Sequence, residues 1–102
     1  MNAVLEEKKD ELMALCRRHK VARLELFGSA TSGAFEPDRS DLDFLVSFEV
    51  HTPEEHADAY FGLLADLEDL FERRIDLVET KAIDNPYFLK AIDRSRALIY
   101  EG

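Results

Sequence analysis

The sequence predicts an α/β (α+β) domain in which a small mixed sheet of three to four strands is covered by helices. Three observations support this class: alternating apolar patterns typical of strands, apolar residues at helical spacing, and the alternation of these two patterns along the chain. With 102 residues, of which 46% are hydrophobic, the chain is long enough for one modest core. We therefore expect a single domain over residues 1–102.

The first half of the chain is predicted to form a helix, a strand, a turn region and a second strand. Apolar residues recur at helical spacing over residues 2–19, with charged residues elsewhere, which predicts an amphipathic helix. Residues 21–27 alternate and are rich in strand formers, so they predict the first strand. The remaining predictions here are a short helical turn over 29–35, a turn over 36–40 and a second strand over 41–48.

The second half begins with a helix that has a clear start signal. Thr52 is suited to cap the helix, Pro53 to be its first residue, and Glu55 to close a capping box. Apolar residues then repeat at helical spacing to about residue 72, and we assign the aromatic ones, Tyr60, Phe61 and Phe71, to the core. The remaining predictions are a strand over 74–79, a helix from Asn85-Pro86 to about Arg94 and a last strand over 97–100.

Composition argues against several function classes. The formal net charge of −9 disfavours extensive nucleic-acid binding, which needs clustered Lys and Arg. No apolar run approaches the roughly 20 residues of a membrane span, and the charged N-terminus lacks the apolar segment of a secretory signal. We therefore expect no membrane association and a cytoplasmic location. The single cysteine, Cys16, fits this as a buried structural thiol.

The sequence motif Gly28-Ser29 follows the first strand directly. A glycine at a strand end lets the backbone approach a ligand closely, and the N–H groups of a following helical turn favour an anion. Ser29 adds a hydroxyl donor. Taken alone, a Gly-Ser pair after a strand is more often a simple turn.

Two aspartates, Asp41 and Asp43, open the otherwise apolar second strand. Side chains alternate along a strand, so these two share one face, and like charges there repel unless a cation lies between them. Two carboxylates at one strand end are as consistent with a metal site as with a purely structural role. The alternative that the residues alone leave open is a strand-capping Asp41 with a solvated Asp43.

A third aspartate, Asp76, interrupts the apolar strand over residues 74–79 and shares a face with Arg74. An ion pair between Arg74 and Asp76 is the simpler explanation of this feature alone. The functional interpretation is a third metal ligand, with Arg74 holding it or contacting a phosphate. Other metal and phosphate motifs are absent from the sequence, because zinc-ligand spacing, a calcium-binding loop and a Walker loop are all missing.

Together, Gly28-Ser29, the run from Ser40 to Val46 that contains Asp-Leu-Asp, and Asp76 resemble the signature of nucleotidyltransferases of the DNA polymerase beta superfamily. The chain is most similar to the small MNT-type members, whose minimal domain has this length. One departure is that eleven residues separate Ser29 from Asp41, one more than the commonest spacing. We expect this residue to lengthen the turn before Asp41 and to leave the site intact.

The resemblance implies a polymerase-beta-like fold, catalysis by Asp41, Asp43 and Asp76, and two magnesium ions, or manganese, held by these carboxylates. It also implies that Gly28 and Ser29, together with Arg74, bind a nucleoside triphosphate, with ATP as the substrate. Oxygen ligands without His or Cys suit such hard cations. The resemblance further implies a partner, a toxin of the HEPN ribonuclease type, whose hydroxyl would receive AMP, which makes this protein the antitoxin.

Two alternative functions are consistent with the same sequence features. In the first, the chain is a non-catalytic acidic binding module that neutralises its partner by complex formation. In the second, it is a small-molecule transferase of the aminoglycoside nucleotidyltransferase type. The second is disfavoured because such enzymes usually carry a further domain for the acceptor.

Overall fold

A four-stranded mixed sheet forms the centre of the computed structural model, which describes residues 3–28, 41–93 and 96–102. Its strands are β1 (Val21–Phe27), β2 (Leu42–Phe48), β3 (Ile75–Glu79) and β4 (Ala97–Glu101), in the spatial order β3-β2-β1-β4. β1 is antiparallel to both β2 and β4, whereas β2 and β3 are parallel. This arrangement confirms the predicted α/β (α+β) class.

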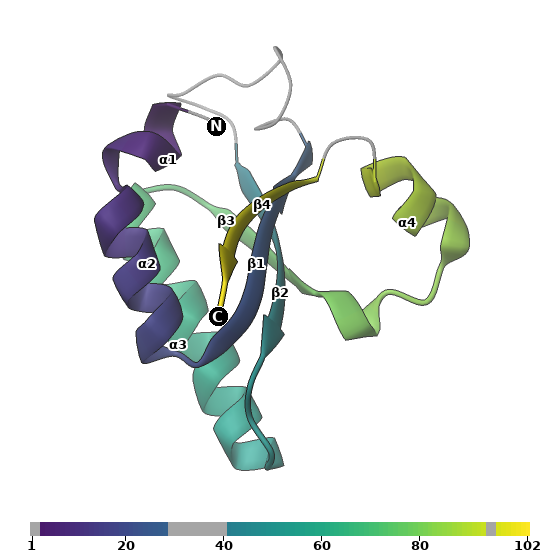
Figure 1. Ribbon diagram of the computed structural model, residues 1–102, viewed down its shortest axis with the longest axis horizontal. Helices are drawn as coiled ribbons and strands as arrows, with labels where there is room; N and C mark the ends of the chain where they lie inside the picture. The colour runs from purple at the N-terminus through teal and green to yellow at the C-terminus, as the bar shows by residue number, and fades with distance from the viewer. Residues whose placement is uncertain (1–2, 29–40, 94–95) are drawn as a thin grey trace.

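Helices lie on both faces of the sheet. The helices α1 (Ala3–Glu7), α2 (Lys9–Arg18) and α3 (Pro53–Phe71) cover one face, and α4 (Pro86–Asp93) lies on the other (Figure 1). A short 3-10 turn, η2 (Thr80–Ala82), follows β3 and begins the connection to α4. Within the described residues, no helix is long and apolar enough to cross a membrane.

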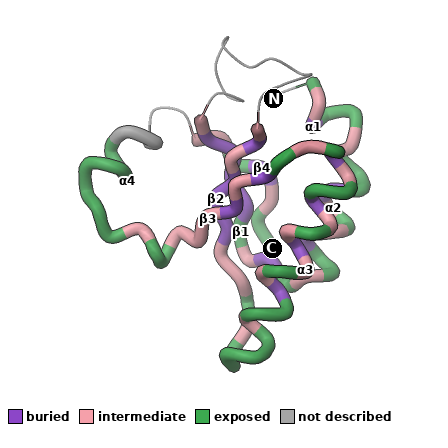
Figure 2. Tube along the Cα trace, turned by 180° about the vertical axis from the view of Figure 1, so that it is seen from behind, coloured by how far each residue is buried: buried purple, intermediate pink, exposed green. Residues whose placement is uncertain are grey.

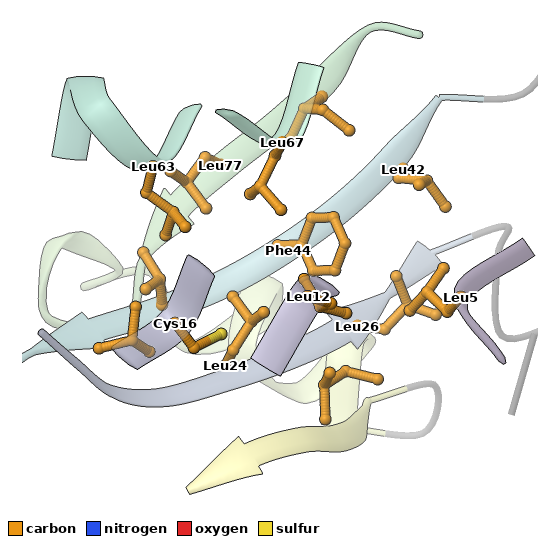
Figure 3. Close-up of a cluster of buried hydrophobic side chains, with 14 of the residues drawn as sticks. Leu5, Leu12, Cys16, Leu24, Leu26, Leu42, Phe44, Leu63, Leu67 and Leu77 are labelled. Atoms are coloured by element: carbon orange, nitrogen blue, oxygen red, sulfur yellow. The ribbon is translucent and has the colours of Figure 1, made fainter. Parts of the chain in front are cut away.

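The main core fills the space between α1–α3 and the sheet (Figure 3). Alternate strand residues point into it because side chains alternate across a sheet. The helices contribute Leu5, Leu12, Cys16, Leu63 and Leu67, and the strands contribute Leu24, Leu26, Leu42, Phe44 and Leu77. Burial raises the pKa of the Cys16 thiol to about 12, which confirms a buried structural cysteine.

The N-terminal helix differs from its prediction. Residues 2–19 were expected to form one helix, but α1 and α2 are separated at Lys8, whose backbone is not helical (φ −113°, ψ 18°). The Lys8 N–H closes a tight turn onto the Leu5 carbonyl at 3.1 Å, and the Lys8 carbonyl accepts the Leu12 N–H at 2.9 Å. The break redirects α1, and Leu5 is fully buried in the same core as Leu12.

The helix α3 starts as predicted. The Thr52 hydroxyl accepts a hydrogen bond from the Glu55 N–H at 3.1 Å, and Pro53 is the first helical residue. The assignment of Phe61 to the core is wrong, because its side chain is 65% exposed. Phe61 lies just outside the buried stripe of α3 and makes an edge-to-face contact with Tyr60, their ring centroids being 5.1 Å apart.

The second face of the sheet has a smaller apolar cluster. Phe27 and Leu45 are buried there, and Val78 and Ile83 pack against them. The helix α4 begins on this side at the predicted cap, where the Asn85 side-chain oxygen accepts the Tyr87 N–H at 2.9 Å. Its described residues are largely exposed (Figure 2). This second face therefore has room for chemistry that the first, filled face lacks.

Candidate active site

The strand order places the predicted site residues in one row. Phe27, which precedes Gly28, pairs with Asp43 across β1 and β2, and Asp43 pairs with Asp76 across β2 and β3. Leu42 and Phe44 point into the main core, so Asp43 between them points to the opposite face, the one on which α4 lies. Gly28, Asp43 and Asp76 thus succeed one another across three adjacent strands.

Gly28 is required for the close approach of the Asp43 carboxylate. Its φ of +76° lies in the left-handed region that glycine adopts without strain. A Cβ atom on this residue would lie 2.3 Å from the Asp43 carboxylate oxygen Oδ2, which is closer than non-bonded atoms come. The glycine therefore allows the end of β1 and the carboxylate of β2 to share one small space. Ser29, which the sequence paired with Gly28, lies outside the described residues, as do the turns expected over 29–35 and 36–40.

The Asp43 carboxyl group is held in an environment that disfavours its charge. Burial, a hydrogen bond with Asp76, and the negative charges of Asp76 and Asp41 raise the pKa of Asp43 to about 6. A pair of neighbouring carboxylates costs free energy unless a proton or a cation lies between them. The arrangement is therefore one that a divalent cation would stabilise.

Asp41 and Arg74 complete the row at its open end. Asp41 directly precedes β2, and the Leu42 N–H donates to the Arg74 carbonyl at 3.3 Å, which holds the starts of β2 and β3 together. The Arg74 Nε lies 3.9 Å from Asp41 Oδ2 and 3.9 Å from Asp76 Oδ1. All three side chains are well exposed, so these long ion pairs contribute little to stability. Arg74 is thus a cation that can move from the carboxylates to a bound anion.

The donor set suits magnesium or manganese by its chemistry. Every candidate ligand is a carboxylate oxygen, the kind of donor that such hard cations prefer. Among residues 3–28, 41–93 and 96–102, no three acidic, His or Cys side chains converge closely enough to ligate a single ion. Magnesium is usually bound by only one or two carboxylates, and substrate phosphates and water supply the rest. The paired carboxylates therefore fit ions that are completed by a triphosphate.

A cavity of about 390 Å³ adjoins the carboxylates, and sequence reasoning did not predict it. Asp43 and Asp76 contribute to its wall, and so does Phe88 from α4. The remaining lining residues come from β1, β3 and α3: Phe27, Ile75, Leu77, Val78, Tyr60 and Leu64. The sequence does contain an aromatic pair, Tyr87-Phe88, in the first turn of a short helix. No pattern in the sequence showed which surface this pair would cover.

A four-stranded mixed sheet with a strand-ending glycine beside paired carboxylates is the arrangement of a nucleotidyltransferase domain. Residues 10–99 match the sequence model of the family described as the nucleotidyltransferase domain, and the chain belongs to this family. The match covers most of the chain and includes each of the predicted site residues. The predicted membership of the MNT-type minimal nucleotidyltransferases is confirmed by the relatives described next.

Two curated proteins of Methanocaldococcus jannaschii, both named as candidate protein adenylyltransferases, are similar to this chain. One is 34% identical over 81% of this chain and 79% of its own length. The other is 37% identical over 84% of this chain and 82% of its own length. Because the alignments cover most of both partners, the similarity concerns the whole domain.

Solved structures have the same fold. A candidate minimal nucleotidyltransferase is 31% identical, covers 91% of this chain and 90% of its own, and superposes with a TM-score of 0.64. A complex of a tri-AMPylated HEPN toxin with its MNT antitoxin, from Shewanella oneidensis, has a chain that is 16% identical, with a TM-score of 0.64 over 95% of this chain and 72% of that one. A toxin–antitoxin pair with AMP-PNP has a chain that is 20% identical, with a TM-score of 0.68 over 92% and 73%. The last two similarities concern the fold alone.

Proposed function

We propose that this protein transfers AMP from ATP to a hydroxyl group on a partner protein and thereby acts as an antitoxin. The observation that carries the proposal is the row formed by Gly28, Asp43 and Asp76 on one sheet face. The proposal is also supported by the two relatives that are named as candidate protein adenylyltransferases. The fold shared with an MNT antitoxin bound to an AMPylated HEPN toxin supports a HEPN-type toxin as the partner.

In this proposal, residues at the ends of different strands bind different parts of the nucleoside triphosphate. Gly28 and Ser29 hold the β- and γ-phosphates, because backbone N–H groups at a strand-to-turn junction can donate to anionic oxygens. Arg74, which is 74% exposed, moves from the carboxylates to a phosphate oxygen. The chain's own contribution is thus to orient the triphosphate along the row.

Asp41 and Asp43 would hold two magnesium ions, and Asp76 would complete the coordination of the ion nearer the acceptor. Such ions neutralise the phosphate charge and lower the pKa of an attacking hydroxyl group. The acceptor oxygen then attacks the α-phosphorus. The bond between the α-phosphorus and the oxygen that bridges to the β-phosphate breaks, and pyrophosphate leaves. The Asp76 carboxylate, which is open to solvent, receives the proton of the hydroxyl group.

The test is incubation of the purified protein with labelled ATP, magnesium and the protein encoded beside it in the genome, followed by intact-mass measurement of both chains. We expect the neighbour to gain one or more AMP groups. The gain should be absent with Asp41→Asn and unchanged with Asp58→Asn, a matched change at an exposed carboxylate of α3.

The same experiment separates transfer from simple binding. If the neighbour gains no mass and yet forms a stable complex, the protein is a binding module and the catalytic proposal is wrong. If Asp41→Asn still modifies the neighbour at the parental rate, the assignment of the aspartates is wrong.

A further inference from the structure

The helix α3 has an outer face that stays exposed along its length. The buried residues of this helix point toward the sheet: Ala59, Leu63, Leu67 and Phe71. On the opposite side, exposed residues recur at intervals of three or four and therefore share one face: Glu54, Ala57, Phe61, Ala65 and Glu68. We call these five residues the α3 strip. Exposed positions repeat along this helix in Figure 2.

The centre of the α3 strip is apolar. The Phe61 side chain is 65% exposed, and its ring meets the ring of Tyr60 on the same helix. Ala57 and Ala65, one turn away on either side, have small side chains that leave the Phe61 ring accessible. An exposed aromatic ring of this kind suits the anchor at the centre of a protein interface.

The charges of α3 are all of one sign. Between Pro53 and Phe71 the helix has no Lys or Arg, and its acidic residues are Glu54, Glu55, Asp58, Asp66, Glu68 and Asp69. Asp66 is compensated from α2, because Arg18 and His19 contact it at 3.5 Å and 2.6 Å. Within the described parts of the chain, Glu54 and Glu68 form no ion pair. Both ends of the α3 strip are therefore negative.

This distribution of charge is unfavourable for the helix by itself. The C-terminal end of a helix carries a partial negative charge, so carboxylates in its last turn are repelled. Glu68 and Asp69 lie in that turn, and it has no basic residue. Positive charge placed against the α3 strip by another molecule would offset this repulsion.

We propose that the α3 strip docks a basic surface of the partner protein, with Phe61 inserted into an apolar recess of that surface. The inference rests on the proposed function for the identity of the partner. It adds the place on this chain where the partner is held and the chemistry that holds it.

The sign of the charge decides between possible occupants. A symmetric pair of copies of this chain would set two α3 strips against each other, and their carboxylates would repel. Nucleic acids and anionic membrane surfaces are also negative, so they are disfavoured for the same reason. A protein surface that combines Lys or Arg with an apolar recess matches both features of the strip.

The α3 strip lies apart from the candidate active site. The helix α3 covers one face of the sheet, whereas Asp43 points to the face on which α4 lies (Figure 1). A partner held by the strip leaves the carboxylates accessible. Docking is therefore independent of ATP and magnesium, and the partner stays bound after AMP has been transferred.

The test measures binding of the protein encoded beside this one in the genome, by isothermal titration calorimetry in EDTA and without ATP. We expect Phe61→Ala, which removes the anchor, and Ala65→Arg, which adds a bulky cation, each to weaken binding about tenfold or more. The controls are Leu98→Ala, at an exposed apolar residue of β4, and Ala14→Arg, at an exposed position of α2. Both controls should bind as the parent does, and thermal melts check that all four variants fold.

The charge of the strip is tested by salt. The association rate of the parent should fall as NaCl rises from about 0.05 M to about 0.3 M. The double variant Glu54→Gln/Glu68→Gln should bind more weakly and depend less on salt. If the double variant keeps the parental salt dependence, the charges of the strip have no part in docking.

Intact-mass measurement after addition of ATP and magnesium separates this inference from the proposed function. A complex that both α3 variants weaken, with no AMP gained by the neighbour, supports the docking surface and contradicts the proposed function. AMP transfer together with parental affinity in both variants overturns the docking surface and leaves the proposed function intact. The docking surface is also wrong if the parent forms no complex with the neighbour, or if Phe61 instead mediates self-association, measured by analytical ultracentrifugation.

Discussion

Asp43 and Asp76 lie directly opposite each other on the parallel strands β2 and β3 and share a hydrogen bond. The negative charge of Asp76 repels an ionised Asp43, so the folded protein holds an unfavourable interaction at this point. We therefore expect the site to bind a cation, and we expect the protein without the cation to be less stable because of this repulsion.

Replacing Asp43 with Asn should stabilise the free protein and abolish nucleotide transfer. The substitution removes a repelled charge and keeps a side chain of the same shape. Because Asp43 is partly open to solvent, we expect a gain of only about 1 kcal/mol in the free energy of unfolding at pH 7.5. Urea unfolding in EDTA measures this, with Asp58→Asn as the control. A variant that is less stable than the parent would show that the repulsion is absent.

The stability difference between the parent and Asp43→Asn should depend on pH. The pKa of Asp43 is raised from its ordinary value of 3.8 to about 6, so the folded state holds this proton more tightly than the unfolded state. The contribution of Asp43 to stability is therefore fully present below pH 3.8 and is lost as the pH rises through about 6. Melting curves of both proteins between pH 4 and 7 should diverge with rising pH.

Magnesium should reverse this pH trend, because it binds the ionised form of Asp43. We expect the ion to raise the melting temperature of the parent at pH 7.5, and to have little effect at pH 4.5, where the proton occupies the site. The Asp43→Asn variant should respond weakly at both values. An equal response at the two pH values would mean that the ion binds elsewhere.

Replacing Gly28 with Ala should disrupt the site more than it disrupts the fold. The new Cβ would collide with the Asp43 carboxylate, and the left-handed backbone would cost about 1 to 2 kcal/mol for alanine. We expect transfer to fall at least a hundredfold, because a misplacement of about 1 Å at a reacting centre has such an effect. Thermal melts and the AMP-transfer assay measure the two effects separately.

Gly62→Ala is the matched control for this change. Gly62 lies in α3, where alanine is the better helix former, and its Cβ would meet only the ring of His19, at 2.8 Å. His19 is a side chain that can shift, although it also contacts Asp66 at 2.6 Å. We expect a small change in stability and full transfer activity. Loss of transfer in both glycine variants would remove the special role of Gly28.

Local patterns were sufficient to predict the four strands and the starts of the helices α3 and α4. All four strands lie within about one residue of their predicted bounds, because alternation and strand-forming residues are local signals. The starts of α3 and α4 were predicted because Thr52 and Asn85 each cap a helix with its own side chain. The break at Lys8 has no such signal, since it depends on how Leu5 packs against the finished core.

The site was predictable only in part. The sequence places three carboxylates near strand ends, but the strand order that sets Asp43 between Gly28 and Asp76 arises from long-range pairing. The contribution of Phe88 was missed for the same reason, because its position depends on where α4 lies relative to the sheet. Glu25 was missed for a similar reason. Its position in the alternating pattern of β1 did not show that its side chain would be buried, or that its partner would lie 71 residues away in the sequence.

That partner is Arg96, and its removal should destabilise the protein. The side chain of Glu25 is only 6% exposed, and Arg96 donates two hydrogen bonds to it, at 2.8 Å from Nε and 2.7 Å from Nη2. Arg96→Met would leave the buried carboxylate with the weaker, more exposed Arg23 at 3.2 Å. We expect a loss of about 2 to 3 kcal/mol, measured by urea unfolding at pH 7.

The double variant Glu25→Leu/Arg96→Met should lose less stability than Arg96→Met alone, because it leaves no unpaired buried charge. The pH dependence provides a second check. Hydrogen bonds from Arg96 lower the pKa of Glu25 below its ordinary 4.5, so this pair stabilises the fold above pH 4.5 and the contribution is lost as the pH falls through the lowered pKa. Arg96→Met should therefore flatten the acid side of the stability curve. If it instead lowers stability equally at pH 3 and pH 7, the residue acts through packing and not through its charge.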